Sequence, residues 1–327
     1  MNQLYSKLQQ ELNDLKVNES LALFSYMKVG GSADYLYTAR TTDDLIQALR
    51  LARKFNLQWT ILGGASNVVI SDQGIRGLVI RNLTNNTGFI VDEGRAIVDS
   101  GLSLARFIML AAQHGLAGLE PLYGIPGTVG GALYGNAGAH QTSISDYLAT
   151  LTVLTEAGEI EQYDKSWLKP EYRDTALKSA RARGVKSGPV ILSAQFQLTQ
   201  AKPEVILKRI REFNSWRLEH QPIGEPCCGS VFRNPDPKVK EKTAGFLLDT
   251  AGAKQLKNGG AHVSKKHANF VVHDGTATAF QIRTLFDRMR ALVQTQHAIA
   301  LQEEIEYLGD WSLTAKEGSH DAPAELA

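Results

Sequence analysis

The chain has 327 residues, 43% of them hydrophobic and 21% charged, and its 35 basic residues nearly balance 34 acidic ones. This length allows two or three domains with a sizeable core, and the near-neutral charge gives no general attraction to nucleic acid or to a membrane surface. No apolar segment has the pattern of a signal peptide or the length of a membrane span. The two cysteines, Cys227 and Cys228, are neighbours, so they cannot cross-link distant segments and do not form a zinc site by themselves. We therefore expect a cytoplasmic protein without a structural metal.

Helices and short strands alternate in the first third of the chain. The spacing of apolar residues predicts helices over residues 2–15 and 43–55, the second capped by Thr42. Strands are predicted over residues 59–62, 68–70, 77–81 and 96–100. The first two strands flank the sequence GGASN at residues 63–67, and a strand after such a turn excludes the first turn of a Rossmann fold. The serine and asparagine of this turn either bind phosphate or bond to the turn itself.

Residues 115–140 form the most unusual stretch, because they contain eight glycines. A helix over residues 104–114 leads into it, with Ser103 as N-cap and Gly115 just past its end. Dense glycines let backbone N–H groups approach a ligand, and successive N–H groups form an anion-binding concavity. The stretch is either a cradle for a diphosphate or a surface loop without a ligand. Neither GxxxxGK[ST] nor a GxGxxG between a strand and a helix is present.

The second half of the chain begins with a β-hairpin over residues 149–163 and a half-buried strand over residues 190–198. A helix then starts at Pro203 and is broken at residues 221–224, so we place a domain boundary near residue 202. Its inward side chains are predicted to be Val205, Ile206, Ile210, Phe213 and Trp216. Further helices are predicted over residues 244–250 and 277–295, and strands over residues 268–273 and 301–308. The residues after Asp310 are expected to be a disordered tail.

Eight segments, in order between residues 20 and 309, together resemble one family, the UDP-N-acetylenolpyruvoylglucosamine reductases. The matching segments are YMKVGGSAD at 26–34, LGGASNVVISDQGIRGLVI at 62–80, GLEPLYGIPGTVGGALYGNAGAH at 118–140, Tyr172-Arg173, GSVFRNP at 229–235, AGFLLDTAGAK at 244–254, SKKHANFVV at 264–272, and Glu304-Ile305 before Leu308-Gly309.

The resemblance implies an α+β fold. It consists of a two-subdomain FAD-binding region of the vanillyl-alcohol oxidase (PCMH-type) kind, at residues 1–85 and 86–201, and a C-terminal α+β substrate domain at residues 202–309. Residues 310–327 form the expected tail. The short separation between Arg173 and the strand from Val190 resembles the second, shorter type of the family, so we assign no substrate-clamping tyrosine.

The implied reaction reduces UDP-N-acetylglucosamine enolpyruvate to UDP-N-acetylmuramate for peptidoglycan, with NADPH as hydride donor and non-covalent FAD as carrier. Hydride reaches C3 of the enolpyruvyl group and a proton reaches C2. By resemblance, Arg173 binds the substrate carboxylate, Glu304 polarises the intermediate and Ser230 donates the proton. We read Cys227 and Cys228 as bystanders.

The resemblance also assigns binding residues. FAD is expected to contact Gly63, Gly64, Ala65, Ser66, Asn67, Gly124, Ile125, Pro126, Gly127, Thr128, Gly130, Gly131, Gly138 and Ala139. The UDP-sugar is expected to contact Tyr172, Arg233, Asn234, Lys254 and Asn269. The departures from the family pattern are Arg233 for lysine, Thr175 for serine, Leu177 for phenylalanine, Gln141 for glycine and His273 for asparagine.

Two other functions compete with this one. A different flavoprotein of the same fold, such as an oxidase of a small alcohol or sugar, would keep both glycine-rich loops without needing Arg173, Ser230 and Glu304 together. A non-catalytic flavin- or UDP-sugar-binding protein is the alternative from another class. We expect the protein to be a monomer.

Overall fold

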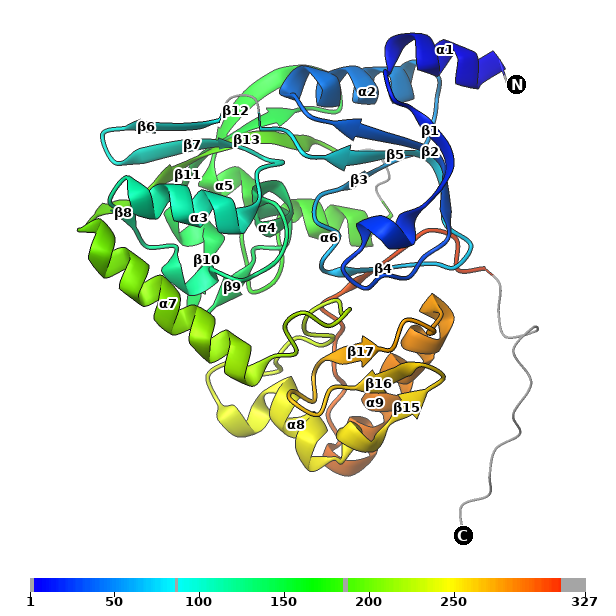
Figure 1. Cartoon of the computed structure of the whole chain (residues 1–327), viewed down its shortest axis with the longest axis vertical. Helices are drawn as coiled ribbons and strands as arrows, with labels where there is room; N and C mark the ends of the chain where they lie inside the picture. Colours follow the sequence, from blue (N-terminus) through cyan, green and yellow to red (C-terminus); the bar gives the residue numbers. More distant parts are fainter. Residues whose placement is uncertain (1–2, 86–87, 185–187, 313–327) are drawn as a thin grey trace.

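The computed structural model describes residues 3–85, 88–184 and 188–312 (Figure 1). The main elements of its first part are α1 (Gln3–Glu11), β1 (Lys16–Ser20), β2 (Ser32–Ala39), α2 (Thr42–Lys54), β3 (Trp59–Leu62) and β5 (Ile75–Asn82). The strands form one sheet in the order β1-β2-β5-β3, in which β2 and β3 run parallel to β5 and β1 is antiparallel to β2. One apolar core joins this sheet to α1 and α2.

The second part is built on a five-stranded antiparallel sheet in the order β12-β11-β13-β7-β6. Its strands are β6 (Phe89–Asp92), β7 (Arg95–Asp99), β11 (Leu148–Leu154), β12 (Ile160–Asp164) and β13 (Val190–Gln197). Its helices are α3 (Leu104–Gln113), α4 (Val129–Tyr134), α5 (Lys165–Leu168), α6 (Ala176–Ala182) and α7 (Pro203–His220). Two-residue strands pair as β8 (Leu116–Ala117) with β14 (Thr199–Gln200) and as β9 (Gly138–Ala139) with β10 (Thr142–Ser143).

Helix α7 packs on the second part, which bears on the domain boundary. Ile206 and Ile210 belong to the same core as Phe107 and Phe196, and Figure 1 shows α7 crossing below α3 on the second part. Val205 and Trp216, predicted to face inward, are instead 46% and 42% exposed. The boundary near residue 202 stays a prediction, but this packing favours a position after α7.

The third part has its own core, formed by two helices and a small antiparallel sheet in the lower half of Figure 1. Its elements are α8 (Ala244–Thr250), β15 (Lys257–Asn258), β16 (Ala261–Val263), β17 (Val271–His273) and α9 (Ala279–His297). Met27, Val29 and Val69 from the first part join this core, so the two parts are packed together. None of the helices in the described ranges is both long and apolar enough to cross a membrane.

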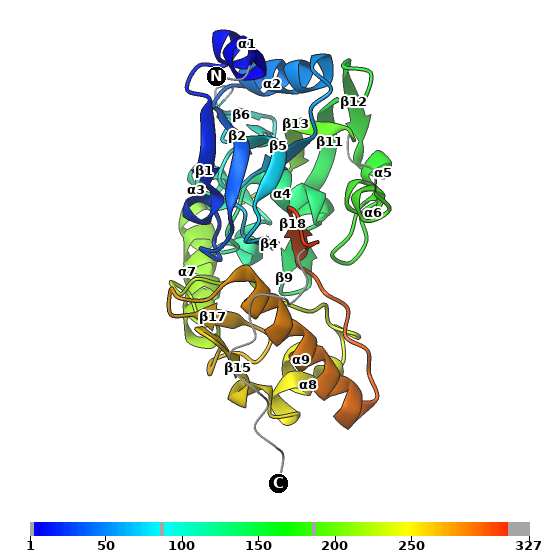
Figure 2. The same cartoon turned by 90° about the vertical axis from the view of Figure 1, so that its right-hand side faces the viewer.

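The chain returns to its first part at the end. β18 (Glu306–Leu308) pairs in parallel with β4 (Val68–Ile70), and Figure 2 shows β18 rising from the lower part to the upper one. The Ser71 hydroxyl then donates a hydrogen bond to the Asp310 carbonyl, and Trp311 packs on Tyr307 with ring centroids 5.1 Å apart. The predicted tail therefore starts with packed residues; its remainder, residues 313–327, lies outside the described ranges.

Several predicted elements differ from the structure in their limits, and for three of them the cause is visible in the structure. α1 ends at Glu11, shortly before Asp14, whose φ of 60° is left-handed. The cap of α2 is Thr41 rather than Thr42, because only Thr41 has an acidic partner, Asp44, in the position that completes a capping box. The strand predicted over residues 301–308 shortens to β18, because Glu303 bridges to Phe232 in the third part before the chain pairs with β4.

Candidate active site

One cavity has a volume of about 670 Å³ and is lined by all three parts of the chain. That volume lies in the range of small-molecule and cofactor sites. The cavity wall includes all fourteen residues predicted to bind FAD, together with Arg173, Ser230 and Glu304. The structure thus brings the predicted cofactor loops and the predicted catalytic residues to one place.

The two glycine-rich loops lie against each other on one wall of this cavity. A Cβ atom on Gly64 would come within 2.6 Å of the Gly127 Cα, and one on Gly63 would meet the Thr128 hydroxyl oxygen at 2.4 Å. The Ser66 hydroxyl donates a 2.7 Å hydrogen bond to the Pro126 carbonyl. Only glycine permits such a close approach of two backbones, so residue identity fixes the shape of this wall.

The backbone of residues 63–67 leaves its donors available. Among the described residues, none accepts a hydrogen bond from the N–H groups of this segment. Successive unpaired N–H groups beside a cavity form an anion-binding site. The segment also contains a left-handed residue, Ala65, with φ of 47°, which turns the chain before β4. This arrangement suits the diphosphate of a dinucleotide cofactor.

Arg217 adds a second feature that fits a flavin cofactor. This residue of α7 lines the cavity and is only 7% exposed, and its Nε atom has no hydrogen-bond partner in the described structure. Its Cδ and Nε atoms also occupy the space beside Gly124, where a Cβ would meet them at 2.9 and 3.1 Å. A buried cation with an unused donor calls for an acceptor from a ligand. The sequence analysis missed Arg217, because an arginine on an amphipathic helix gives no signal of its orientation.

Arg173 and Glu304 form a pair at the cavity. The Arg173 Nε atom lies 2.9 Å from Glu304 Oε1, and the two side chains are only 20% and 17% exposed. A second nitrogen of Arg173, Nη2, donates to the Gly138 carbonyl in the glycine-rich stretch. Arg173 has a left-handed φ of 57° within a tight turn closed by Glu171 and Asp174, and a backbone held in this way often marks a functional position.

Burial and charge act in opposite directions on Glu304. Removal from water raises the pKa of its carboxyl group, while Arg173, Lys178 and Arg233 work against that rise. The net pKa lies above the ordinary value. A carboxyl group with a raised pKa at a cavity is typical of acid–base chemistry.

Ser230 lies on a loop that its neighbours hold in place. Gly229 precedes it with a left-handed φ of 77°, and Val231 N–H donates 2.9 Å to the Asn269 carbonyl. The Asn269 side chain accepts from Phe232 N–H at 3.0 Å and donates to the Phe232 carbonyl at 2.8 Å. Cys227 also lines the cavity, and burial raises the pKa of its thiol, which keeps it protonated at neutral pH.

The five residues predicted to bind the UDP-sugar do not line this cavity. Asn269 is 2% exposed and both its amide oxygen and its amide nitrogen bond to the backbone of Phe232, so in this structure it supports the Ser230 loop. Asn234 accepts a 3.0 Å hydrogen bond from Ala244 N–H at the start of α8, and Lys254 lies 2.9 Å from Asp249. Tyr172 is 41% exposed, with the Arg173 guanidinium 5.2 Å from its ring centroid.

Arg233 is the exception among them, because it is available for a ligand. Its Nε atom is buried and has no partner in the described structure, and its charge acts on both Lys178 and Glu304. An arginine with an unused donor near the catalytic pair suits an anionic group of a substrate.

Comparisons with known proteins agree with this geometry. A model described as "FAD binding domain" matches residues 33–164, and one described as "UDP-N-acetylenolpyruvoylglucosamine reductase, C-terminal domain" matches residues 221–308. The second match begins directly after α7.

Proteins with the same name resemble nearly the whole chain. A UDP-N-acetylenolpyruvoylglucosamine reductase 1 of Bacillus cereus is 36% identical over 310 residues, which cover 94% of this chain and 100% of the relative. A reductase of Gloeobacter violaceus is 40% identical over 298 residues, covering 91% and 97% of the two chains. The crystal structure of the reductase from Thermus caldophilus has a TM-score of 0.73 at 29% identity and covers 90% of this chain and 98% of its own. These matches confirm the predicted α+β fold with its FAD-binding region, and the chain belongs to the UDP-N-acetylenolpyruvoylglucosamine reductases, oxidoreductases of peptidoglycan precursor synthesis.

Proposed function

We propose that this chain reduces UDP-N-acetylglucosamine enolpyruvate to UDP-N-acetylmuramate, with NADPH as the hydride donor. The observation that carries the proposal is that Arg173, Glu304 and Ser230 line the same cavity as the two glycine-rich loops. When bound, FAD supplies a carrier that takes hydride from NADPH and gives it to C3 of the enolpyruvyl group.

Arg173 supplies positive charge where the substrate becomes more negative. Its planar guanidinium matches a carboxylate and remains charged at any working pH. As C3 receives hydride, charge moves from C2 into the substrate carboxylate, and a preorganised cation stabilises that change. The contacts with Glu304 and the Gly138 carbonyl hold the guanidinium in position beforehand.

Ser230 then donates its hydroxyl proton to C2. A serine hydroxyl is a weak acid, so it has to be placed close to the carbon and in positive surroundings. Asn269 fixes the residues that follow it, and Arg173 provides a cation at the same cavity. Glu304, whose pKa is raised, lies opposite and polarises the same group.

The nucleotide of the substrate reaches beyond the cavity. We assign its anionic groups to Arg233 and Lys254 and further contacts to Tyr172 and Asn234; Asn269 contributes through the loop it supports. A tight ion pair such as that of Lys254 with Asp249 has to exchange partners when a phosphate binds.

The test follows the absorbance of the flavin in purified protein. We expect NADPH alone to bleach the flavin without oxygen, and the enolpyruvyl sugar nucleotide to restore its colour with formation of UDP-N-acetylmuramate. UDP-N-acetylglucosamine, which lacks the enolpyruvyl group, is the matched control and should restore nothing. Bleaching that only molecular oxygen reverses would contradict the proposal and indicate an oxidase.

A further inference from the structure

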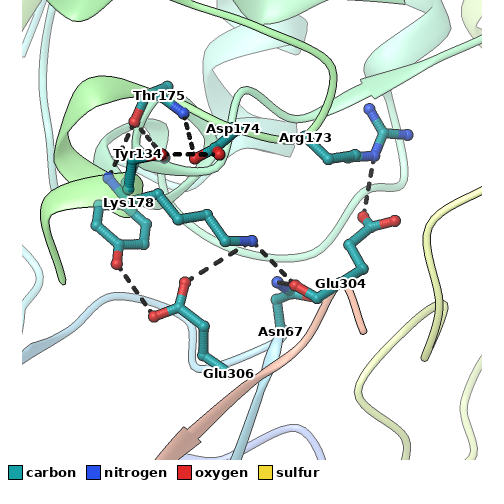
Figure 3. Close-up of polar contacts among 9 residues, drawn as sticks. Asn67, Tyr134, Arg173, Asp174, Thr175, Lys178, Glu304 and Glu306 are labelled. Atoms are coloured by element: carbon teal, nitrogen blue, oxygen red, sulfur yellow. Dashed lines mark hydrogen bonds and ion pairs between the residues drawn. The ribbon is translucent and has the colours of Figure 1, made fainter. Parts of the chain in front are cut away.

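A buried lysine lies beside the catalytic pair. Lys178 is on α6, lines the cavity and is only 7% exposed. Its Nζ atom donates a 2.9 Å hydrogen bond to the Glu304 carbonyl and lies 3.8 Å from Glu306 Oε1 (Figure 3). Burial lowers the pKa of this ammonium group, and Glu306 opposes the change. Burying an ammonium group costs free energy, and lysine side chains are rarely buried unless they are paired, so this burial indicates a specific role.

Several distant segments meet at the main chain of Glu304. Asn67, from the loop before β4, donates its amide Nδ2 to the same carbonyl at 3.1 Å, and Glu304 N–H donates 2.8 Å to the Val231 carbonyl. The Tyr134 hydroxyl of α4 donates a 3.0 Å hydrogen bond to Oε2 of Glu306, whereas Lys178 lies near Oε1 of the same carboxylate. Figure 3 shows the lysine side chain extended between the Glu304 carbonyl and the Glu306 carboxylate.

The charges around the Glu304 carboxylate come from three places. Arg173 approaches from the turn after β12 and α5, Lys178 from α6 and Arg233 from the loop after Ser230, and all three oppose the rise in its pKa. Glu306 lies two residues further along the chain and forms an ion pair with Lys178. Lys178 therefore acts on Glu304 twice, through a hydrogen bond to its main chain and through its charge.

We propose that Lys178 is a positioning residue of this reductase: it holds the main chain of Glu304 so that the carboxylate stays against Arg173, and it supplies positive charge beside that carboxylate. The inference rests on the proposed function, because Glu304 acts in the step on the enolpyruvyl group. Lys178 itself transfers no proton. Its effect belongs to the second half of the reaction, in which the sugar nucleotide is reduced.

The experiment measures the two halves separately by rapid mixing across a range of pH. Lys178→Met removes the charge and the donor, Lys178→Arg keeps a cation, and Lys208→Met removes an exposed lysine of α7 as control. Glu304→Gln identifies which limb of the wild-type pH profile reports Glu304, because that limb is missing in this variant.

In Lys178→Met we expect NADPH to reduce the flavin at the wild-type rate. The rate of the second half-reaction should fall on the order of 10²-fold, the usual effect of a group misplaced by an ångström. Without the Lys178 charge the pKa of Glu304 rises further, so its limb moves to higher pH. Lys178→Arg should restore part of the rate and return the limb towards its wild-type position, and Lys208→Met should match wild type in both halves.

Three results would overturn the inference. One is a second half-reaction in Lys178→Met that proceeds at the wild-type rate. Another is equal slowing of both half-reactions with the Glu304 limb of the pH profile at its wild-type position, which would indicate a general structural role. If Lys178→Met loses its flavin, Lys178→Gln is judged by the same two measurements, and loss of flavin there as well assigns Lys178 to folding. Failure of the wild-type second half is a separate outcome, because it rejects the proposed function itself.

Discussion

Ser230 is the residue whose role the structure allows to be tested most cleanly. Within the described ranges of the chain, its hydroxyl makes no hydrogen bond, while its loop is held by the Asn269 side chain. We expect Ser230→Ala to fold, keep its flavin and accept hydride from NADPH normally. The second half should slow by about 10² to 10⁴, the range for loss of a general acid.

The measurement is single-turnover absorbance of the pre-reduced protein after addition of the sugar nucleotide. Ser264→Ala is a suitable control, because Ser264 is a serine of the third part that does not line the cavity. Equal loss of both half-reactions in Ser230→Ala would assign Ser230 to folding and remove it from the mechanism.

Single residues also show where sequence reasoning reached its limit. The fourteen residues expected to contact FAD, and Arg173, Ser230 and Glu304, were named because they lie in segments that match the family, and all of them line the cavity; their roles stay predictions. Lys178 and Arg217 were missed, because each lies alone on a helix and only packing turns it inward. The UDP-sugar residues were named by resemblance, and Asn269 illustrates the gap, since its amide is used on the backbone of Phe232.

Helix α6 connects the Arg173 turn to Lys178, and its first turn depends on Thr175. The Thr175 hydroxyl oxygen accepts from Lys178 N–H at 3.3 Å, and its proton goes to the Tyr134 carbonyl at 2.7 Å. Either hydroxyl residue can make these bonds, so the departure from the family's serine leaves the cap intact.

We therefore expect Thr175→Ser to be nearly neutral and Thr175→Ala to cost about 1 kcal/mol, the usual value of an N-cap. In a protein of this size that corresponds to a fall in Tm of about 2 °C. Thermal unfolding of the two flavin-loaded variants measures the difference. An equal fall in both would mean that the methyl packing of Thr175, rather than its hydroxyl, matters.

Several helices and strands were predictable from local patterns, whereas β1, β2 and α6 were not predicted. The limits of β3 and β4 match the prediction, and the hairpin of β11 and β12 forms as expected, because alternation and turn residues are local signals. The cap at Thr41 and the exposure of Val205 and Trp216 were not predicted. Thr41 and Thr42 are both possible caps of α2, and only the position of Asp44, three residues after Thr41, distinguishes them. The inward face of α7 depends on the segment it packs against, which the sequence does not identify.

On the scale of the whole protein, the cavity wall draws on all three parts, so a ligand there should stabilise the entire chain. We expect the protein stripped of flavin to unfold at a lower temperature, and FAD at about 100 times its Kd to restore about 2.7 kcal/mol by mass action. Riboflavin, which lacks the diphosphate and adenosine, is the matched control. It should raise Tm less, because it has no phosphate for the N–H groups of residues 63–67 to bind. Equal shifts with FAD and riboflavin would show that this loop does not bind the diphosphate.

Domain organisation was the least accessible level. The helix that starts at Pro203 suggested a domain boundary near residue 202, but Ile206 and Ile210 of this helix, α7, pack in the core of the second part. The parallel pairing of β18 with β4 gave no signal either, since a strand of three residues is too short for a periodic pattern. Both depend on contacts between segments that the sequence alone does not pair.

That pairing has a consequence for how the protein is made. Asn67 and Glu304 are 237 positions apart, yet the amide of one holds the carbonyl of the other. Domains fold in order as the ribosome delivers them, so the flavin loops emerge long before the segment that carries Glu304. Contacts of such long range also form slowly. Nascent chains are therefore expected to remain without activity until β18 has left the exit tunnel, long after residues 63–67 have emerged.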